Sequence, residues 1–137
     1  MTSTINPILV IAEAGVNHNG DPAIARQMIE AAAAAGADIV KFQTWKPGEV
    51  TGRFAFKVPY LQSSTPDDET RFELSRRLCL PYDTFRELKQ HCEKVGIEFM
   101  STPDGFESLD FLVDELDMRR IKIGSTELNH LPFLEAV

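Results

Sequence analysis

Two lysines interrupt apolar segments of the chain, at positions where a charged side chain is costly to bury. Lys41 stands between a valine and a phenylalanine, and Lys122 stands between two isoleucines. A buried ammonium group is stable only where a negative charge compensates it. The pair therefore indicates a binding site for phosphate or carboxylate, to which serine and threonine hydroxyls would add hydrogen bonds.

Two other interpretations of these lysines stay open at the level of sequence. Glu13 and Glu127 could neutralise the lysines in purely structural ion pairs. Alternatively, one lysine could be a Schiff-base nucleophile, which would require a lowered pKa. The two glutamates could also act as acid–base groups or bind the hydroxyls of a sugar.

Polar side chains follow each of four apolar segments. The four groups are Glu13, Asn17 and His18; Lys41, Gln43 and Thr44; Ser101, Thr102 and Asp104; and Lys122, Ser125, Thr126 and Glu127. In a parallel barrel, the carboxyl ends of all strands face one mouth, where barrel enzymes hold their active sites. We therefore treat the four groups as one candidate site.

The elements that would position these residues alternate between strands and helices. Continuous apolar runs predict buried strands at 8–12, 38–42, 97–100 and 120–123. Helical spacing and end signals predict helices at 22–35, 65–78, 81–95 and 106–116, and another from residue 131. The polar segment 44–64 is predicted to be a functional loop.

Two of these helices have a recognisable buried face. The first is expected to begin after an N-cap at Asp21 and to bury Ile24, Met28, Ala32 and Ala35. The helix at 106–116 is expected to bury Phe106, Leu109, Leu112, Val113 and Leu116.

The alternation favours a parallel sheet with right-handed crossovers, either as a doubly wound open sheet or as a (β/α)₈ barrel. An open sheet would need a glycine-rich phosphate turn after its first strand, and the segment 13–20, EAGVNHNG, is not such a turn. We therefore expect an α/β fold of the (β/α)₈ TIM-barrel type. Residues 1–137 would supply about its first four β/α units.

Composition excludes several classes of protein. The net charge of −7, from 14 basic and 21 acidic residues, disfavours nucleic acid and anionic membranes as partners. No apolar run approaches the roughly 18 residues that a membrane span needs. The N-terminal residues do not resemble a signal peptide. Two cysteines and three scattered histidines match no metal or redox spacing, so no metal ligand is assigned in this chain.

Four segments together resemble the family of N-acetylneuraminate (sialic acid) synthases, which includes legionaminic acid synthases. In the order of the family, these segments are IAEAGVNHNG at 11–20, VKFQT at 40–44, FMSTP at 99–103 and IKIGSTE at 121–127. The resemblance covers almost the whole chain. The first motif, in combination with the second, is specific for this family.

The resemblance implies a reaction between phosphoenolpyruvate and an open-chain N-acyl hexosamine of the N-acetylmannosamine type, which yields a nine-carbon 2-keto acid and phosphate. It implies that phosphoenolpyruvate is held by Lys41, Thr102, Lys122 and Ser125, and the sugar by Gln43 and Glu127, with Glu13 close to the reacting centre. It also implies a divalent metal, manganese or magnesium, a cytoplasmic location and a homodimer of the full-length protein.

The chain departs from the family pattern at two places and in length. Threonine stands at 126 where glycine is usual, and Asp104-Gly105 follows Thr102-Pro103 where an aromatic residue is common. The metal-binding histidines of the family lie on later strands. We therefore expect an N-terminal part of the barrel that is inactive alone. A non-catalytic half-barrel that pairs with a copy of itself or with a partner, and a Schiff-base aldolase, are the alternatives.

Overall fold

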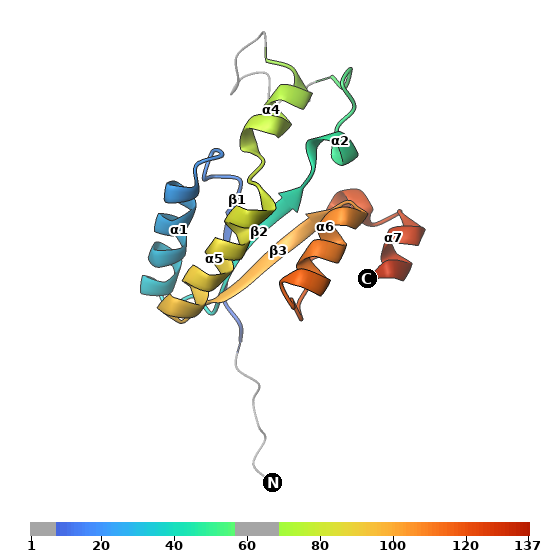
Figure 1. The fold of residues 1–137 in the computed structure, drawn as a ribbon. Helices are drawn as coiled ribbons and strands as arrows, with labels where there is room; N and C mark the ends of the chain where they lie inside the picture. Colours follow the sequence, from blue (N-terminus) through green and yellow to red (C-terminus); the bar gives the residue numbers. More distant parts are fainter. Residues whose placement is uncertain (1–7, 57–68) are drawn as a thin grey trace.

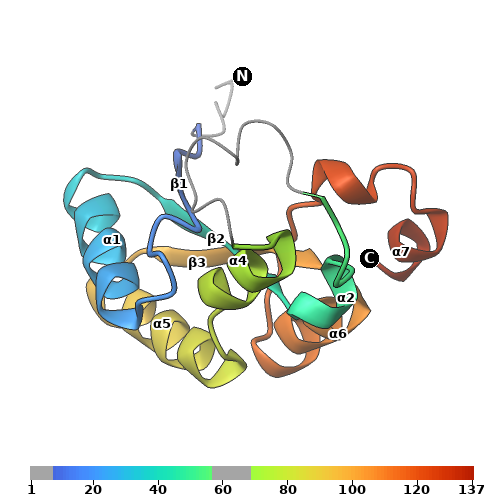
Figure 2. The same cartoon turned by 90° about the horizontal axis from the view of Figure 1, so that it is seen from above.

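The computed structural model describes residues 8–56 and 69–137, which form a parallel sheet covered by helices. Three strands, in the spatial order β1-β2-β3, make up the sheet: β1 (Ile11–Gly15), β2 (Ile39–Trp45) and β3 (Glu98–Asp104). One side of the sheet carries helices α1 (Pro22–Ala34), α5 (Tyr82–Val95) and α6 (Phe106–Asp110), as Figures 1 and 2 show. The π-helical turn η1 (Phe111–Glu115) continues α6.

Short elements lie beyond the carboxyl ends of the strands. Helices α2 (Pro47–Val50) and α4 (Arg71–Leu78) stand above β2 in Figure 1. The 3₁₀ turn η2 (Ser125–Glu127) and helix α7 (Leu131–Ala136) lie beside the end of β3. Because these elements gather at one end of the sheet, they can form the walls of a site there.

Strand register decides which polar residues share a face. The Cα partners are Glu13 with Lys41, Gln43 with Thr102, and Trp45 with Asp104. Paired residues of parallel strands point to the same side, and side chains alternate along each strand. We call the side that carries Glu13, Lys41, Gln43 and Thr102 the site face, and the side covered by the helices the helix face.

The helix face holds the main core. Phe42 and Phe99 stack there with ring centroids 5.9 Å apart, and Phe85 of α5 meets the edge of Phe99. Thr44 and Ser101 also point to this side, where their buried hydroxyls lie 2.7 Å apart. Each hydroxyl thereby satisfies the other, so these two residues belong to the core and not to the candidate site.

Helices α1 and α5 are found where they were predicted. Helix α1 has the expected N-cap, since Asp21 Oδ1 accepts a 2.7 Å hydrogen bond from the backbone of Ala23. Of its predicted face, Ala32 is buried, whereas Ile24 is 39% exposed and Ala25 and Ile29 are buried instead. Helix α5 agrees with the prediction and ends at Gly96, whose φ of 79° is a left-handed conformation that glycine adopts without strain.

Helix α4 begins later than predicted. Thr70 is its N-cap and forms a reciprocal capping box with Glu73, so the helix starts at Arg71. The predicted start at 65 and the part of the expected loop at 57–64 lie outside the described residues. The rest of that loop is partly regular, because β2 runs to Trp45 and α2 follows it.

The face predicted for the helix at 106–116 is correct at three of its five positions. Its second half is π-helical, which adds a residue to the turn and rotates the later side chains relative to an α-helix. Phe111 is consequently buried and Val113 is 41% exposed, while Phe106, the first residue of α6 and ahead of the π-helical turn, is 42% exposed. Leu109, Leu112 and Leu116 are buried as expected.

The predicted fourth strand at 120–123 is wrong for the described structure. These residues are irregular and make no ladder with β3. The chain is held to β3 by side chains instead, since the Arg120 guanidinium donates to both carboxylate oxygens of Glu98 at 2.7 and 2.8 Å. Ile121 packs against the core, and Lys122 is exposed rather than enclosed between isoleucines.

Candidate functional site

An ion pair on the site face joins neighbouring strands. The Lys41 ammonium contacts the Glu13 carboxylate, and the side chains are 15% and 49% exposed. A Cβ added at Gly15 would lie 3.1 Å from Glu13 Oε1 and 3.7 Å from Gln43 Nε2, so both side chains converge on that glycine. The structure therefore places three of the predicted residues, Glu13, Lys41 and Gln43, in one cluster.

This pairing bears on the alternatives for Lys41. Glu13 neutralises the lysine within the described structure, as one of the sequence interpretations held. The pair is also suited to bind an anion, because an ammonium group on a largely buried stem can donate to a phosphate or carboxylate beside Glu13. A Schiff-base role would require the same amine to be released from the carboxylate.

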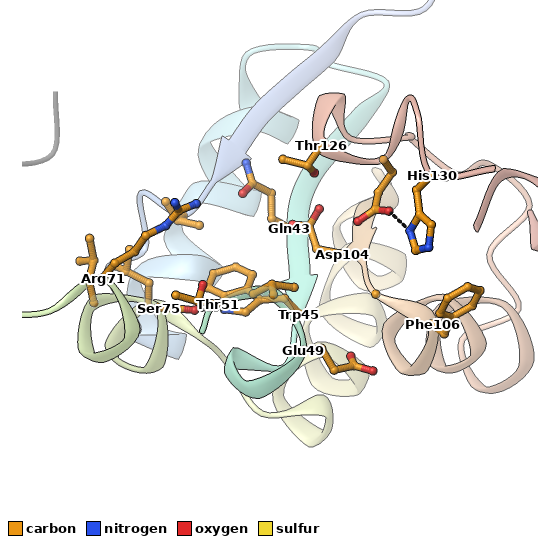
Figure 3. Close-up of a pocket in the computed structure, with 16 residues that line it drawn as sticks. Gln43, Trp45, Glu49, Thr51, Arg71, Ser75, Asp104, Phe106, Thr126 and His130 are labelled. Carbon is orange, nitrogen blue, oxygen red and sulfur yellow. Dashed lines mark hydrogen bonds and ion pairs between the residues drawn. The ribbon is translucent and has the colours of Figure 1, made fainter. Parts of the chain in front are cut away.

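A pocket of about 740 Å³ opens beyond the ends of β2 and β3, a volume typical of small-molecule sites (Figure 3). Its polar wall includes two predicted sugar-binding residues, Gln43 and Glu127. The remaining walls come from the β1 end, α2, α4, the β3 end and the start of α7: Val16, Trp45, Glu49, Val50, Thr51, Arg71, Leu74, Ser75, Leu78, Asp104, Gly105, Phe106, Thr126 and His130. The pocket thus combines a polar side with apolar surface, as sites for small molecules usually do.

Trp45 is fixed as part of this pocket. Its indole N–H donates a 2.8 Å hydrogen bond to Ser75 Oγ of α4, and its side chain is buried. Trp45 thereby joins the end of β2 to α4 and lines the pocket. Ser75 and Arg71, spaced by one helical turn on α4, were missed because nothing in their sequence distinguishes them from surface residues.

Acidic groups gather on the polar wall. Burial, with a smaller contribution from Glu127, raises the pKa of Asp104 to about 6, and Lys122 opposes this rise. Glu127 Oε2 lies 2.7 Å from His130 Nδ1, a contact drawn as a dashed line in Figure 3. His130 also lines the pocket, which its place in the sequence does not indicate.

The other predicted residues are placed less centrally. Thr102 is buried beside Gln43 on the site face. Lys122 donates to the carbonyl of Ile123 and pairs with no carboxylate among residues 8–56 and 69–137, so Glu127 does not neutralise it. Ser125 is exposed in η2, and neither it nor Lys122 lines the pocket.

His18 belongs to the core and not to the pocket. Its ring is fully buried against Phe42, and Nδ1 accepts a 3.0 Å hydrogen bond from the backbone N–H of Gly20. Nε2 has no partner in the described part of the chain, and burial lowers the pKa of the imidazole. The described arrangement therefore keeps His18 neutral and uses it to shape the loop after β1.

Within the two described ranges, no group of three or more histidine, cysteine, aspartate or glutamate side chains is placed to hold a metal ion. The residues described here therefore do not fit a resident metal, and the expectation of ligands elsewhere stays a prediction. None of the described helices has the length and apolar character that a membrane crossing requires.

The chain is similar to known proteins over most of its length. The model of the NeuB family matches residues 28–137. The N,N'-diacetyllegionaminic acid synthase of Campylobacter jejuni is 43% identical over 94% of this chain and 38% of that protein. The N-acetylneuraminate-9-phosphate synthase of Homo sapiens is 37% identical over 95% of this chain and 36% of that protein.

Solved structures confirm the architecture. The N-acetylneuraminic acid synthetase of Leptospira borgpetersenii, in complex with citrate, matches 99% of this chain and 44% of that chain with a TM-score of 0.76 and 28% identity. The spore coat protein SpsE of Bacillus subtilis matches with a TM-score of 0.68 and 34% identity. The chain is thus an α/β partial barrel that spans well under half the length of these relatives.

Proposed function

The chain belongs to the NeuB family, and from this premise we propose that the full-length protein condenses phosphoenolpyruvate with an N-acyl amino sugar. Carbon 3 of phosphoenolpyruvate attacks the sugar aldehyde, whose oxygen takes up a proton. Water adds at carbon 2, and phosphate leaves with cleavage of the C–O bond. The products are a nine-carbon 2-keto acid and inorganic phosphate.

The observation that carries this proposal is the cluster on the site face beneath the pocket. Lys41 is largely buried next to Glu13 and Gln43, and Gln43 also lines the pocket above. We assign Lys41 and Thr102 to the anionic groups of phosphoenolpyruvate, with Lys122 and Ser125 approaching from the segment that follows β3. Gln43 and Glu127 are assigned to the sugar. Glu13 would hold or transfer a proton at the reacting centre.

Several relatives support the reaction class. Two legionaminic acid synthases, from Campylobacter jejuni and Legionella pneumophila, and a human N-acetylneuraminate-9-phosphate synthase are 37–43% identical to this chain. A divalent metal bound by residues outside this chain, a cytoplasmic location and a homodimer complete the proposal.

The test is an assay of the full-length protein with phosphoenolpyruvate, Mn²⁺ and either N-acetylmannosamine or a di-N-acetylated analogue. We expect inorganic phosphate and a 2-keto acid to appear in equal amounts, and only when both substrates are present. Phosphate release without a sugar, or no release with either sugar, would contradict the proposal. Covalent labelling of Lys41 by a carbonyl substrate and borohydride would favour the Schiff-base aldolase.

A further inference from the structure

Asp104 is a pocket residue to which the proposed reaction gives no role. It is the last residue of β3, lies opposite Trp45 in the register of the sheet, and lines the pocket. In Figure 3 its carboxyl group points toward the same space as Gln43 and Thr126. Among the described residues, no donor is hydrogen-bonded to this half-buried carboxyl. A partner from a ligand would therefore complete it.

Two glycines make room around Asp104. A Cβ at Gly124 would lie 3.2 Å from Asp104 Oδ1 and 3.3 Å from Thr126 Oγ1, which is tighter than most real contacts. On the other side, Gly105 has a φ of 96°, and a Cβ there would lie 2.7 Å from Glu49 Oε2. The Asp104 carboxyl thus lies close to the backbone of Gly124, and the Glu49 carboxylate lies close to the backbone of Gly105.

The charges around Asp104 indicate what kind of group it meets. Glu127 from η2 and Lys122 act on it directly, Glu49 approaches Gly105 next to it, and His130 is bonded to Glu127. Three carboxyl groups therefore surround this position, with only one lysine and one histidine to balance them. They would repel a phosphate or carboxylate group of a ligand. Hydroxyl and acylamino groups are neutral and can donate to or accept from a carboxyl, so they fit.

We propose that Asp104 determines which N-acyl amino sugar the pocket accepts, by hydrogen bonding to a hydroxyl or acylamino group of the sugar. This inference rests on the proposed condensation and identifies a specificity-determining residue within it. The pKa of about 6 agrees with this role, because the group can serve as donor or as acceptor near neutral pH.

The experiment uses the full-length protein with Asp104→Leu and Asp104→Asn. Leucine removes hydrogen bonding, whereas asparagine keeps the shape and the polar groups. Asp110→Asn is the matched control, because Asp110 is an exposed carboxylate of α6 outside the pocket. We would measure kcat/KM for N-acetylmannosamine and for a di-N-acetylated analogue, together with KM for phosphoenolpyruvate.

We expect Asp104→Leu to lower kcat/KM for the preferred sugar by about 10-fold or more and to change the ratio between the two sugars. Asp104→Asn should change that ratio by a smaller factor, and KM for phosphoenolpyruvate should stay within about twofold in both variants. If the leucine variant does not fold, the ratio of kcat/KM for the two sugars in the asparagine variant tests the role of Asp104.

Other outcomes separate this inference from the proposed function. Wild-type activity with an unchanged sugar ratio in the asparagine and leucine variants would overturn the role of Asp104 and leave the condensation intact. If KM for phosphoenolpyruvate rose as much as kcat/KM for the sugar fell, Asp104 would act on phosphoenolpyruvate and not on the sugar alone. That result would also overturn the proposed role of Asp104. No activity of the wild-type protein with either sugar would overturn both.

Discussion

Polar side chains have different surroundings on the helix face and on the site face of the same sheet. On the helix face, Thr44 and Ser101 are buried and satisfy each other at 2.7 Å. On the site face, Lys41 meets Glu13, and Gln43 and Thr102 lie beside them without closing a core. Consecutive residues of β2 thus belong to the core and to the candidate site in turn, because strand side chains alternate between the two sides.

A polar residue near a strand end is therefore not by that fact a site residue. Thr44 and Ser101 were grouped with the site because they follow apolar segments, but their parity along the strand sends them to the core. Their partners in the register, and not their distance from the strand end, decide their role. The two faces should therefore respond differently to substitution.

The largest effect on stability is expected on the helix face. Phe42→Ala would remove a fully buried ring that packs on Phe99 and His18. We expect the free energy of unfolding of the full-length protein to fall by about 3–5 kcal/mol. Urea unfolding monitored by circular dichroism would measure it, and a loss below about 1 kcal/mol would contradict the assignment of Phe42 to the core.

A substitution at the pocket should act in the opposite direction. The pKa of Asp104 is raised from 3.8 to about 6, so the folded protein binds this proton more tightly than the unfolded chain does. The stability that the proton confers is full below about pH 4 and is lost as the pH rises through about 6. Asp104→Asn should therefore stabilise the protein at pH 8 by about 1–2 kcal/mol, after allowance for partial exposure.

Unfolding at two pH values checks this sign. The free energy of unfolding of the Asp104→Asn variant should exceed that of the wild type clearly at pH 8, and this difference should nearly vanish at about pH 4. The Asp110→Asn control should show no comparable change, because Asp110 is an exposed residue outside the pocket. An equal gain at both pH values would contradict a raised pKa. Stabilisation together with altered sugar preference would show that the pocket gives up stability for function.

The smallest effect on stability is expected for the hydroxyl pair of Thr44 and Ser101. Thr44→Val and Ser101→Ala should each cost about 1 kcal/mol of stability, because each leaves a buried hydroxyl without its partner. The double variant should lose less than the sum of the single losses, since it leaves neither hydroxyl unpaired. Strict additivity would contradict the pairing. The steady-state constants of the folded variants should not change.

Much of the fold followed from local signals in the sequence. The N-cap at Asp21, the glycine stop at Gly96 and the apolar runs identified α1, α5 and three strands. Two errors arose from tertiary context. The π-helical turn rotated the face that buries Phe111, and segment 120–123 is held by the Arg120–Glu98 pair instead of a backbone ladder.

The site was predictable only where a residue type contradicted its surroundings. Lys41 stands out because it interrupts an apolar strand, and the structure gives it a partner, Glu13, that the sequence had named as an alternative. Arg71 and His130 could not be recognised, because they reach the pocket through helices whose positions depend on packing across the sheet end. Asp104 was noted as a departure from the family, and its environment became visible only in three dimensions.

In the proposed function, Lys41 on the site face binds the anionic groups of phosphoenolpyruvate. Steady-state kinetics of the full-length Lys41→Ala variant test this role, with Lys46→Ala as control. Lys46 is the next lysine along the chain, but it pairs with Glu107 at the surface and does not line the pocket. We predict that kcat/KM for phosphoenolpyruvate falls by about 100-fold or more in Lys41→Ala and by less than about twofold in Lys46→Ala. Equal values for the two folded variants would contradict the claim.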